Sequence, residues 1–233
     1  MNWLLFNSGK CGAAFNMGLD EALLEHVARL GQPALRFYGW TEPAASFGYF
    51  QKFSEVEAAT KLRPLVRRPT GGGIVPHDAD WTYSVVAPPG HAWHSLNAAE
   101  SYRRIHEWIQ RAFAALAIET ALAPDKKSAL GPRPPAASAA CFVGHEKFDL
   151  LWHGQKIAGA AQRRNKLGLL IQGSVQPPPP AVSRGDWEQA MLAVGAAEFK
   201  AVWQGGELDA AVLAAANQLA SRKFSRNEYN QKR

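Results

Sequence analysis

The chain has few cysteines, no long apolar run and no dense basic cluster before its last residues. Of its 233 residues only Cys11 and Cys141 are cysteines, too few for a disulfide framework, and no second Cys or His stands at zinc-ligand spacing. No stretch approaches the roughly 18 uninterrupted apolar residues of a membrane span, and the opening MNWLLFNSGK lacks the pattern of a secretory signal. We therefore expect a reduced, cytoplasmic protein with no metal site and no membrane partner.

The charge balance favours an acidic partner but does not identify it. The formal net charge is +6 and the pI is about 9.4. Basic residues are scattered until the tail RKFSRNEYNQKR (222–233), and no basic patch with interleaved aromatics indicates a nucleic-acid binder. An acidic protein substrate explains the charge equally well, through electrostatic steering of the encounter. A non-catalytic or nucleic-acid-binding module is therefore only a third hypothesis.

The order of predicted elements indicates an α+β domain. At 25.4 kDa, residues 1–233 are expected to form one domain with a substantial core. Apolar or alternating runs bounded by turn residues predict strands at 3–6, 34–38, 45–49, 81–86, 148–153, 156–161 and 169–175. Helical periodicity and capping residues predict helices from Asn16 to about 31, and at 97–116, 186–194 and 207–222. Residues 123–140 lack periodicity and predict a long loop that runs into Cys141.

Residues 67–84 (RRPTGGGIVPHDADWTYS) are the stretch most suggestive of a binding site. Three consecutive glycines allow the backbone to approach a ligand and leave amides free to donate hydrogen bonds. An arginine beside such a loop, Arg68, can hold an anion or a carboxylate through paired N–H groups. His77 can bind a ligand or be a hydrogen-bonded loop histidine. A glycine-rich hairpin with solvated arginines is the alternative interpretation of the whole stretch.

Two further residues are candidates for chemistry. Lys156 enters a small-residue strand in HGQKIAGAAQRR, where it lies either at an exposed rim or in a pocket. In a pocket its ammonium could pair with a carboxylate or stabilise an acyl oxyanion. Cys141 is a candidate nucleophile if a nearby cation lowers its pKa, although free cysteines are often buried and inert. Cys11 is interpreted as structural.

Several motifs in order resemble the lipoate/biotin protein ligase superfamily, in its lipoyl- and octanoyl-transferring branch. They are NMGLDEALL, LRFYGW…FGYFQ, RRPTGGGIVPHD…TYSV, GQKIAGAAQRR and LASRKFSRNEYNQKR, and they run from about residue 16 to the end. The resemblance implies a central mixed β-sheet flanked by helices. It implies transfer of an octanoyl or lipoyl group to a lysine of a lipoyl carrier domain, of the 2-oxoacid dehydrogenase E2 or glycine cleavage H protein type.

The resemblance also implies roles for particular residues. Cys141 and Lys156 would be catalytic. The substrate-binding residues would be Arg68, Thr70, Gly71, Gly72, Gly73, His77, Asp149 and Gly159.

Two chemistries compete within the branch. Octanoyltransferases take the acyl group from acyl carrier protein onto a cysteine and need no cofactor, whereas lipoate ligases use ATP and magnesium to form an acyl-adenylate. The position of Cys141 upstream of Lys156 favours the cysteine enzyme, as does Phe148–Asp149 where the ligases typically carry an Asn-Asp pair. Gly73, a position where the transferases usually have Arg, favours the ligase. Gln172–Gly173 stands where the branch commonly has His-Gly, which leaves the role of that histidine open.

Overall fold

The computed structural model describes residues 1–125 and 145–233. Cys141 and most of the loop predicted at 123–140 therefore lie outside the described residues. The strands are β1 (Asn2–Cys11), β2 (Ala34–Trp40), β3 (Ala44–Phe47), β4 (Leu65–Arg67), β5 (Val75–His77), β6 (Trp81–Ala87), β7 (Ala121–Leu122), β8 (Leu150–Trp152), β9 (Gln155–Asn165), β10 (Gly168–Val175) and β11 (Val202–Gly205). The helices are α1 (Ala13–Leu30), α2 (Phe53–Ala59), α3 (Ala92–Ser95), α4 (Ala98–Ala115), α5 (Arg184–Phe199), α6 (Ala210–Leu219) and α7 (Asn227–Asn230), with a π-helical turn at Ala220–Phe224.

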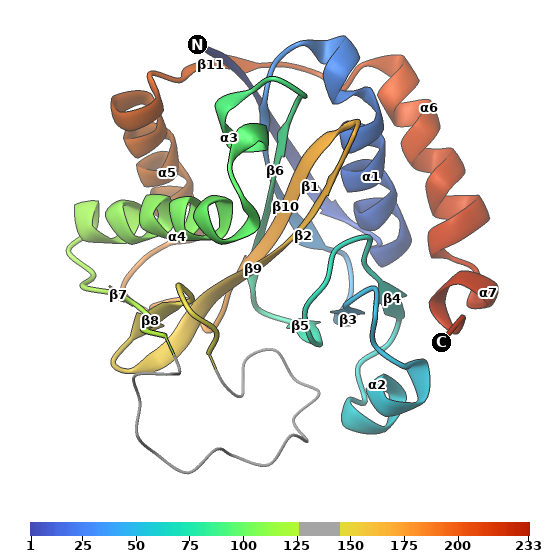
Figure 1. The fold of residues 1–233 in the computed structure, drawn as a ribbon. Helices are drawn as coiled ribbons and strands as arrows, with labels where there is room; N and C mark the ends of the chain where they lie inside the picture. Colours follow the sequence, from blue (N-terminus) through green and yellow to red (C-terminus); the bar gives the residue numbers. More distant parts are fainter. Residues whose placement is uncertain (126–144) are drawn as a thin grey trace.

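A mixed eight-stranded sheet forms the centre of the molecule (Figure 1). Its strand order is β11-β1-β2-β6-β10-β9-β8-β7. The pairs β11–β1 and β1–β2 are parallel, and every later neighbour pair is antiparallel. The predicted α+β class with a central mixed sheet is confirmed, and the same fold occurs in solved structures described below.

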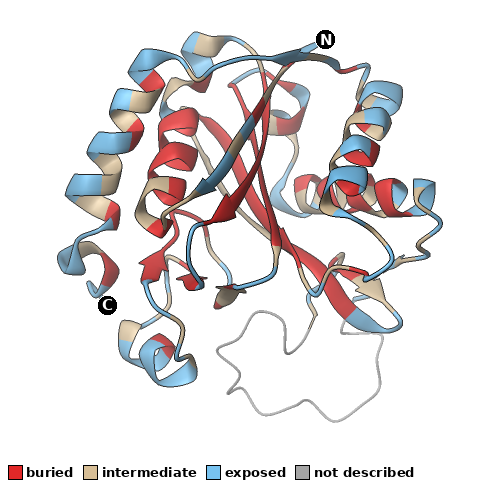
Figure 2. Ribbon diagram, turned by 180° about the vertical axis from the view of Figure 1, so that it is seen from behind, coloured by how far each residue is buried: buried red, intermediate tan, exposed pale blue. Residues whose placement is uncertain are grey.

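Helices cover both faces of this sheet (Figures 1 and 2). Helix α1 lies against one face and is itself covered by α6, so α1 is buried while the outer side of α6 faces solvent (Figure 2). Helices α4 and α5 cover the other face, where Trp3, Trp108 and Trp187 belong to a large apolar core. Because each layer presents an apolar side to the sheet, two cores form, one on each face.

A small second sheet lies below the main one and carries the glycine-rich segment. Its order is β4-β3-β5, with β3 parallel to β4 and antiparallel to β5. Residues 68–74 connect β4 to β5, so the loop of residues 70–73 stands between two strands of this sheet. The alternative interpretation of this stretch as a glycine-rich hairpin is wrong, because β4 and β5 both pair with β3 and not with each other.

Most predicted elements are present, with corrected boundaries. Asn97 caps α4 as expected, because its side-chain oxygen accepts a hydrogen bond from the Glu100 N–H at 2.9 Å. The expectation that Asn16 caps α1 is wrong: the helix begins at Ala13 after Gly12, and Asn16 is fully buried inside it. Its amide donates instead to the carbonyls of Cys11 and Gly39. Within the described ranges, no helix combines the length and apolarity needed to cross a bilayer.

Candidate functional site

An open pocket lies between the two sheets, and helix α1 contributes Met17 to its wall. Its empty space, solvent mouth included, is about 410 Å³. Strands of both sheets contribute to its wall, and the lining residues are Met17, Tyr38, Trp40, Ser46, Arg68, Val75, His77, Thr82, Gly159, Ala160, Ala161, Gln172, Gly173 and Ser174. The wall combines aromatic and small apolar groups with a few buried polar ones, the composition typical of a small-molecule site.

The glycine-rich loop is held against the β3–α2 connection by close backbone packing. Gly72 adopts φ +88°, a conformation that favours glycine. A Cβ added to Gly48 would lie only 1.9 Å from the Gly72 carbonyl oxygen, so no larger residue fits at Gly48. The Tyr49 N–H also donates to the Thr70 carbonyl at 2.9 Å. These backbone contacts fix the shape of the loop of residues 70–73.

Arg68 contributes to that shape. One terminal nitrogen donates to the carbonyls of Gly71 and Gly73, at 2.7 and 3.0 Å, and the other donates to Ser46 Oγ at 3.0 Å. The side chain is buried and lines the pocket. Arg68 thus binds the glycine loop directly, and its predicted contact with substrate stays a prediction.

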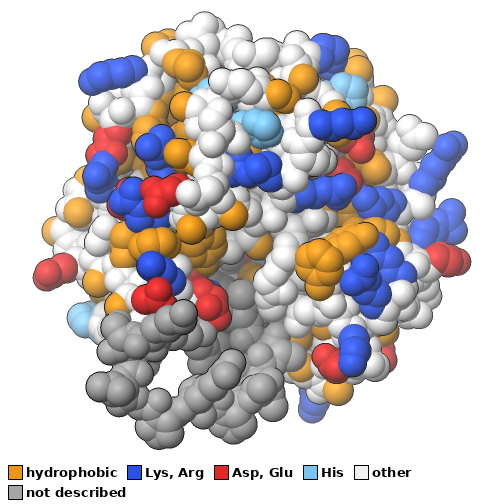
Figure 3. Space-filling view, viewed as in Figure 1, with side chains coloured by type: hydrophobic (Ala, Val, Ile, Leu, Met, Phe, Trp, Pro, Cys, Tyr) orange, Lys and Arg blue, Asp and Glu red, His pale blue; other side chains and the backbone are white. Residues whose placement is uncertain are grey.

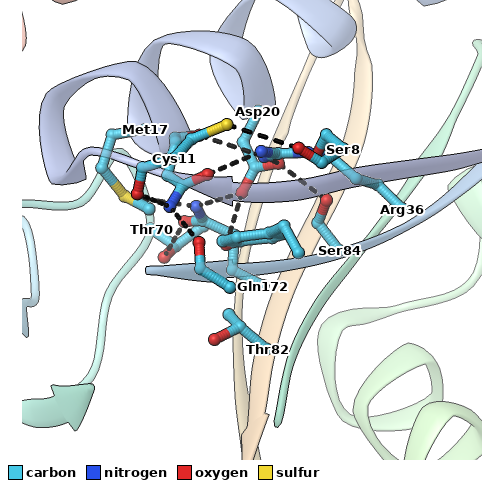
Figure 4. Close-up of polar contacts among 12 residues, drawn as sticks. Ser8, Cys11, Met17, Asp20, Arg36, Thr70, Thr82, Ser84 and Gln172 are labelled. Carbon is cyan, nitrogen blue, oxygen red and sulfur yellow. Dashed lines mark hydrogen bonds and ion pairs between the residues drawn. The ribbon is translucent and has the colours of Figure 1, made fainter. Parts of the chain in front are cut away.

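Gln172 connects the glycine loop to a buried ion pair (Figure 4). Its side-chain oxygen accepts from the Thr70 hydroxyl at 2.8 Å, and its amide nitrogen donates to Asp20 Oδ2 at 2.7 Å. The same amide nitrogen lies 3.4 Å from Met17 Sδ. A glutamine can accept and donate at the same time. At this position it ties strand β10 to both the loop and helix α1.

Asp20 and Arg36 form the ion pair, with Nη1 and Oδ1 2.7 Å apart and both side chains fully buried. The Ser84 hydroxyl also donates to Asp20, at 2.7 Å (Figure 4). The Tyr38 hydroxyl donates to the same carboxylate at 2.9 Å. The guanidinium of Arg36 makes further bonds to Asn16. Burial and the Asp20 carboxylate raise the pKa of Tyr38 well above its usual value. Every polar group of this pair is satisfied within the protein, as a buried pair requires.

His77 lies in the pocket wall in a fixed orientation. Its Nε2 is 2.7 Å from Ser46 Oγ and its Nδ1 is 2.9 Å from Asp80 Oδ2. The ring stacks on Trp40, with centroids 3.8 Å apart. Burial disfavours the Asp80 carboxylate, but His77 and two hydroxyl donors outweigh this effect and lower the pKa of Asp80. Both interpretations of His77 are compatible with this geometry, since the histidine is hydrogen-bonded and also lines the pocket.

Lys156 is buried, not at an exposed rim. Its Nζ lies 2.8 Å from Asp149 Oδ2, with side chains 4% and 0% exposed. A Cβ added to Gly159 would lie 2.7 Å from that Nζ, so the lysine passes directly over Gly159, which lines the pocket. The sequence alternative of a solvent-exposed rim lysine is therefore wrong, because strand β9 turns this side chain toward buried Asp149.

Groups from helix α4 complete the surroundings of Asp149. The Tyr102 hydroxyl donates to Asp149 Oδ1, and the Glu146 N–H donates to Oδ2 at 2.6 Å. The His106 ring contacts that of Tyr102 at a tilt of 51°, with centroids 4.4 Å apart, and its Nδ1 is 2.9 Å from the Tyr102 carbonyl oxygen. Burial lowers the pKa of His106 to about 4 despite the nearby Asp149 carboxylate. Among the described residues, the His106 Nε2 has no hydrogen-bond partner.

The structure thus brings together most of the predicted site. Arg68, His77 and Gly159 line the pocket. Thr70 and the glycine loop are hydrogen-bonded to the lining residues Gln172 and Arg68, and the Lys156–Asp149 pair lies beside Gly159. The role of each in binding stays a prediction, and Cys141 lies outside the described residues. Three residues of this network, Tyr102, Asp20 and Arg36, were given no role from the sequence, because their partners lie elsewhere along the chain. Gln172 was noted only as standing where the branch has a histidine, and its bonds to Thr70 and Asp20 were not predicted.

Metal binding has no candidate in the described part of the chain. In residues 1–125 and 145–233, no three His, Cys, Asp or Glu side chains lie together as metal ligands would.

Solved structures share the fold at low sequence identity. Protein Ta0514 of T. acidophilum, solved with bound lipoic acid, superposes with a TM-score of 0.80 at 21% identity, covering 99% of this chain and 100% of that chain. A lipoate-protein ligase A bound with ATP superposes with a TM-score of 0.78 at 20% identity, covering 99% and 98%.

Sequence relatives are closer in identity. The octanoyltransferase LipM of Anoxybacillus flavithermus is 40% identical over 183 residues, and that of Bacillus subtilis is 39% identical over 183 residues. Each match covers 74% of this chain and 64% of the relative, so the match spans less than two thirds of these proteins. Residues 12–176 match the lipoyl protein ligase A/B catalytic domain, and they include the glycine loop, Lys156 and the whole pocket wall. With most of its length matched, the chain belongs to the lipoyl protein ligase A/B catalytic domain family.

Proposed function

We propose that this chain transfers an octanoyl group from acyl carrier protein to a lysine of a lipoyl carrier domain, through a thioester on Cys141. The observation that carries the proposal is the buried Lys156 ammonium beside Gly159, at the edge of a largely apolar pocket. Similarity to octanoyltransferases LipM supports the reaction type. In this proposal the carrier domains are of the E2 or H protein type. The reaction takes place in the cytoplasm and needs no cofactor.

The first step forms the acyl-enzyme. The Cys141 thiolate attacks the carbonyl carbon of the octanoyl thioester, a new C–S bond forms, and the carrier thiolate leaves. Negative charge develops on the carbonyl oxygen during this step. The Lys156 ammonium and the N–H groups of the glycine loop are the donors proposed to stabilise it. Asp149 holds the ammonium in place through their ion pair, with Nζ 2.8 Å from Oδ2.

The second step forms the product amide. The neutral amine of the carrier lysine attacks the acyl-enzyme, the C–N bond forms and the Cys141 thiolate leaves. The amine nitrogen loses one proton as the amide forms, and this proton neutralises the charge of the released thiolate. The octanoyl chain would lie in the pocket, where burial contributes about 0.8 kcal/mol per methylene.

Intact-mass measurement after incubation with octanoyl-acyl carrier protein tests the nucleophile. We expect wild type to gain the mass of one octanoyl group, Cys141→Ser to gain none, and the matched control Cys11→Ser to behave as wild type. Transfer to an added lipoyl domain should follow the same pattern. Full transfer activity in Cys141→Ser would contradict the thioester mechanism.

An ATP-dependent lipoate ligase is the second candidate. The observation that favours it is the uninterrupted Gly71–Gly73 triplet, which resembles the ligases. ATP and magnesium would then be required. Lipoylation of a lipoyl domain by Cys141→Ser from free lipoate, dependent on ATP, would establish the ligase and exclude the transferase.

A further inference from the structure

An exposed aromatic ring lies beside a group of basic side chains near the glycine loop. Phe50 is 73% exposed, more than any other large hydrophobic side chain of the described residues. Its ring contacts that of Tyr49 edge-on at 5.2 Å. We call this region the basic–aromatic surface, and it consists of Tyr49, Phe50, Arg222, Lys223, Arg226, Tyr229, Lys232 and Arg233. Figure 3 shows Lys and Arg side chains gathered along the side of the molecule where Figure 1 places α6 and α7.

The basic and aromatic groups of this surface are in contact. The Lys232 Nζ lies 3.9 Å from the Tyr49 ring centroid and 4.3 Å from that of Tyr229. Lys223 lies 4.8 Å from the Tyr229 ring. An open cleft of about 820 Å³, solvent mouth included, is lined by four basic side chains, one tyrosine and one carboxylate: Arg222, Lys223, Arg226, Lys232, Tyr229 and Glu228. The basic residues of the tail thus contact one aromatic ring of the tail itself, Tyr229, and one from a distant loop, Tyr49.

The surface has a fixed position relative to the pocket. Arg67 is fully buried and donates to the carbonyls of Asn230, Tyr49 and Gln51, at 2.7–3.2 Å. It therefore fastens the C-terminal segment to the β3–α2 connection. Tyr49 in turn bonds the Thr70 carbonyl of the glycine loop. A partner docked on the surface would stand next to the loop at the pocket.

Positive charge on this surface is only partly neutralised. Glu21 pairs with Lys223 and with Arg163 of strand β9. Within residues 1–125 and 145–233, no carboxylate forms an ion pair with Arg222, Arg226 or Lys232, and all three are exposed. The hydrogen bond and charge of Lys232 lower the pKa of Tyr49, which shows the local positive field.

We infer that the basic–aromatic surface docks the acyl donor, an acidic carrier protein that presents its thioester on an arm attached through a phosphodiester. This inference rests on the proposed function. The donor brings negative charge on its surface and on its arm, which complements the exposed cations. Phe50 would supply the apolar contact at the centre of the interface.

Charge reversal with a matched control tests the inference. The surface variant is Arg222→Glu/Arg226→Glu/Lys232→Glu, and the control is Arg104→Glu/Lys166→Glu/Lys200→Glu, which changes the net charge equally at other sites. At low salt we expect the surface variant to weaken binding of octanoyl-acyl carrier protein by roughly tenfold or more, measured by fluorescence anisotropy. Because salt shortens the Debye length to about 3 Å at 1 M, the difference should disappear there. Phe50→Ala should weaken binding at both salt concentrations.

Kinetics separate docking from chemistry. In the surface variant we expect KM for octanoyl-acyl carrier protein to rise by a similar factor, while acylation by the uncharged octanoyl-N-acetylcysteamine is unchanged. Unaltered binding, an equal loss in the control variant, or a rise in KM for the lipoyl domain alone would each overturn the inference. If wild type forms no octanoyl adduct, the proposed function fails. The binding measurement then still decides the docking surface.

Discussion

Two buried ion pairs border the pocket, and they differ in what surrounds them. In the Asp20–Arg36 pair, the carboxylate also accepts hydrogen bonds from hydroxyl and amide groups of the neighbouring strands, so its hydrogen bonds are all made within the protein. Asp149–Lys156 includes a flexible lysine that passes over a pocket glycine. Arginine with its fixed fork of donors suits the first role, and a compact ammonium on a flexible stem suits chemistry. We propose from this comparison that the first pair is structural and that the second takes part in the chemistry.

Removing the arginine should have the largest effect, on stability. We expect Arg36→Met to lower the free energy of unfolding by about 3–5 kcal/mol, because Asp20 is left buried without its cation. Denaturant unfolding measures this loss. The control Arg29→Met breaks an exposed pair with Asp209 and should cost about 1 kcal/mol or less. Equal losses in the two variants would show that Arg36 is not the structural member of the comparison.

Removing the lysine pair should affect activity far more than stability. The double variant Lys156→Met/Asp149→Asn leaves no unpaired buried charge, and the amide introduced at position 149 can still accept a hydrogen bond from Tyr102. We expect the rate of octanoyl transfer to fall roughly 10²–10³-fold, the usual cost of losing one donor to an oxyanion. Asp149→Asn alone leaves the buried lysine without its carboxylate and should also lower stability, which the double variant avoids. A double variant that transfers at the wild-type rate would remove Lys156 from the chemistry.

The stability of the region around Asp149 and Lys156 should also depend on pH, because His106 lies there. The folded protein keeps His106 neutral down to its pKa of about 4, whereas the unfolded chain binds a proton near pH 6.5. The stabilising contribution is therefore complete above pH 6.5 and is lost as the pH falls toward 4. At about 1.36 kcal/mol per pKa unit, the loss in the free energy of unfolding over this pH range is about 3 kcal/mol. We expect His106→Phe to flatten unfolding free energy against pH in this window, and an unchanged slope would contradict the assignment.

Matched tyrosine variants give the smallest and most direct comparison. Tyr102 donates to Asp149 and Tyr38 donates to Asp20. Each Tyr→Phe change should cost about 1 kcal/mol of stability. Only Tyr102→Phe is expected to lower kcat for acylation, by roughly fivefold, because it loosens the carboxylate that holds Lys156. A larger fall in kcat for Tyr38→Phe would reverse the roles of the two pairs.

Local patterns predicted the elements whose signals are local. The apolar stripe and Asn97 cap of α4 are of this kind, and so are the strands near 81–86 and 169–175. The cap at Asn16 was predicted wrongly because a polar residue next to an apolar stripe can either cap a helix or lie inside it. Here the side-chain amide of Asn16 donates hydrogen bonds to backbone carbonyls of β1 and β2. Only the packed sheet provides those carbonyls.

The residues of the candidate site also divide into those that local patterns predicted and those that only the fold brings in. Residues 67–84 and Lys156 were predicted as site candidates from glycine content, basic residues and the resemblance to a family. The partners of these residues come from remote segments: Gln172 lies 102 residues from Thr70 and 152 from Asp20. No window along the chain contains such a network.

The amino-acid sequence by itself determined the fold class, the glycine loop and the family, since these follow from short-range patterns of side chains. The tertiary structure alone decided that Lys156 is buried against Asp149, that Arg68 binds the loop, and that the basic tail meets Tyr49 and Phe50. The physical reason is that burial and hydrogen bonding depend on which distant strands become neighbours in the sheet.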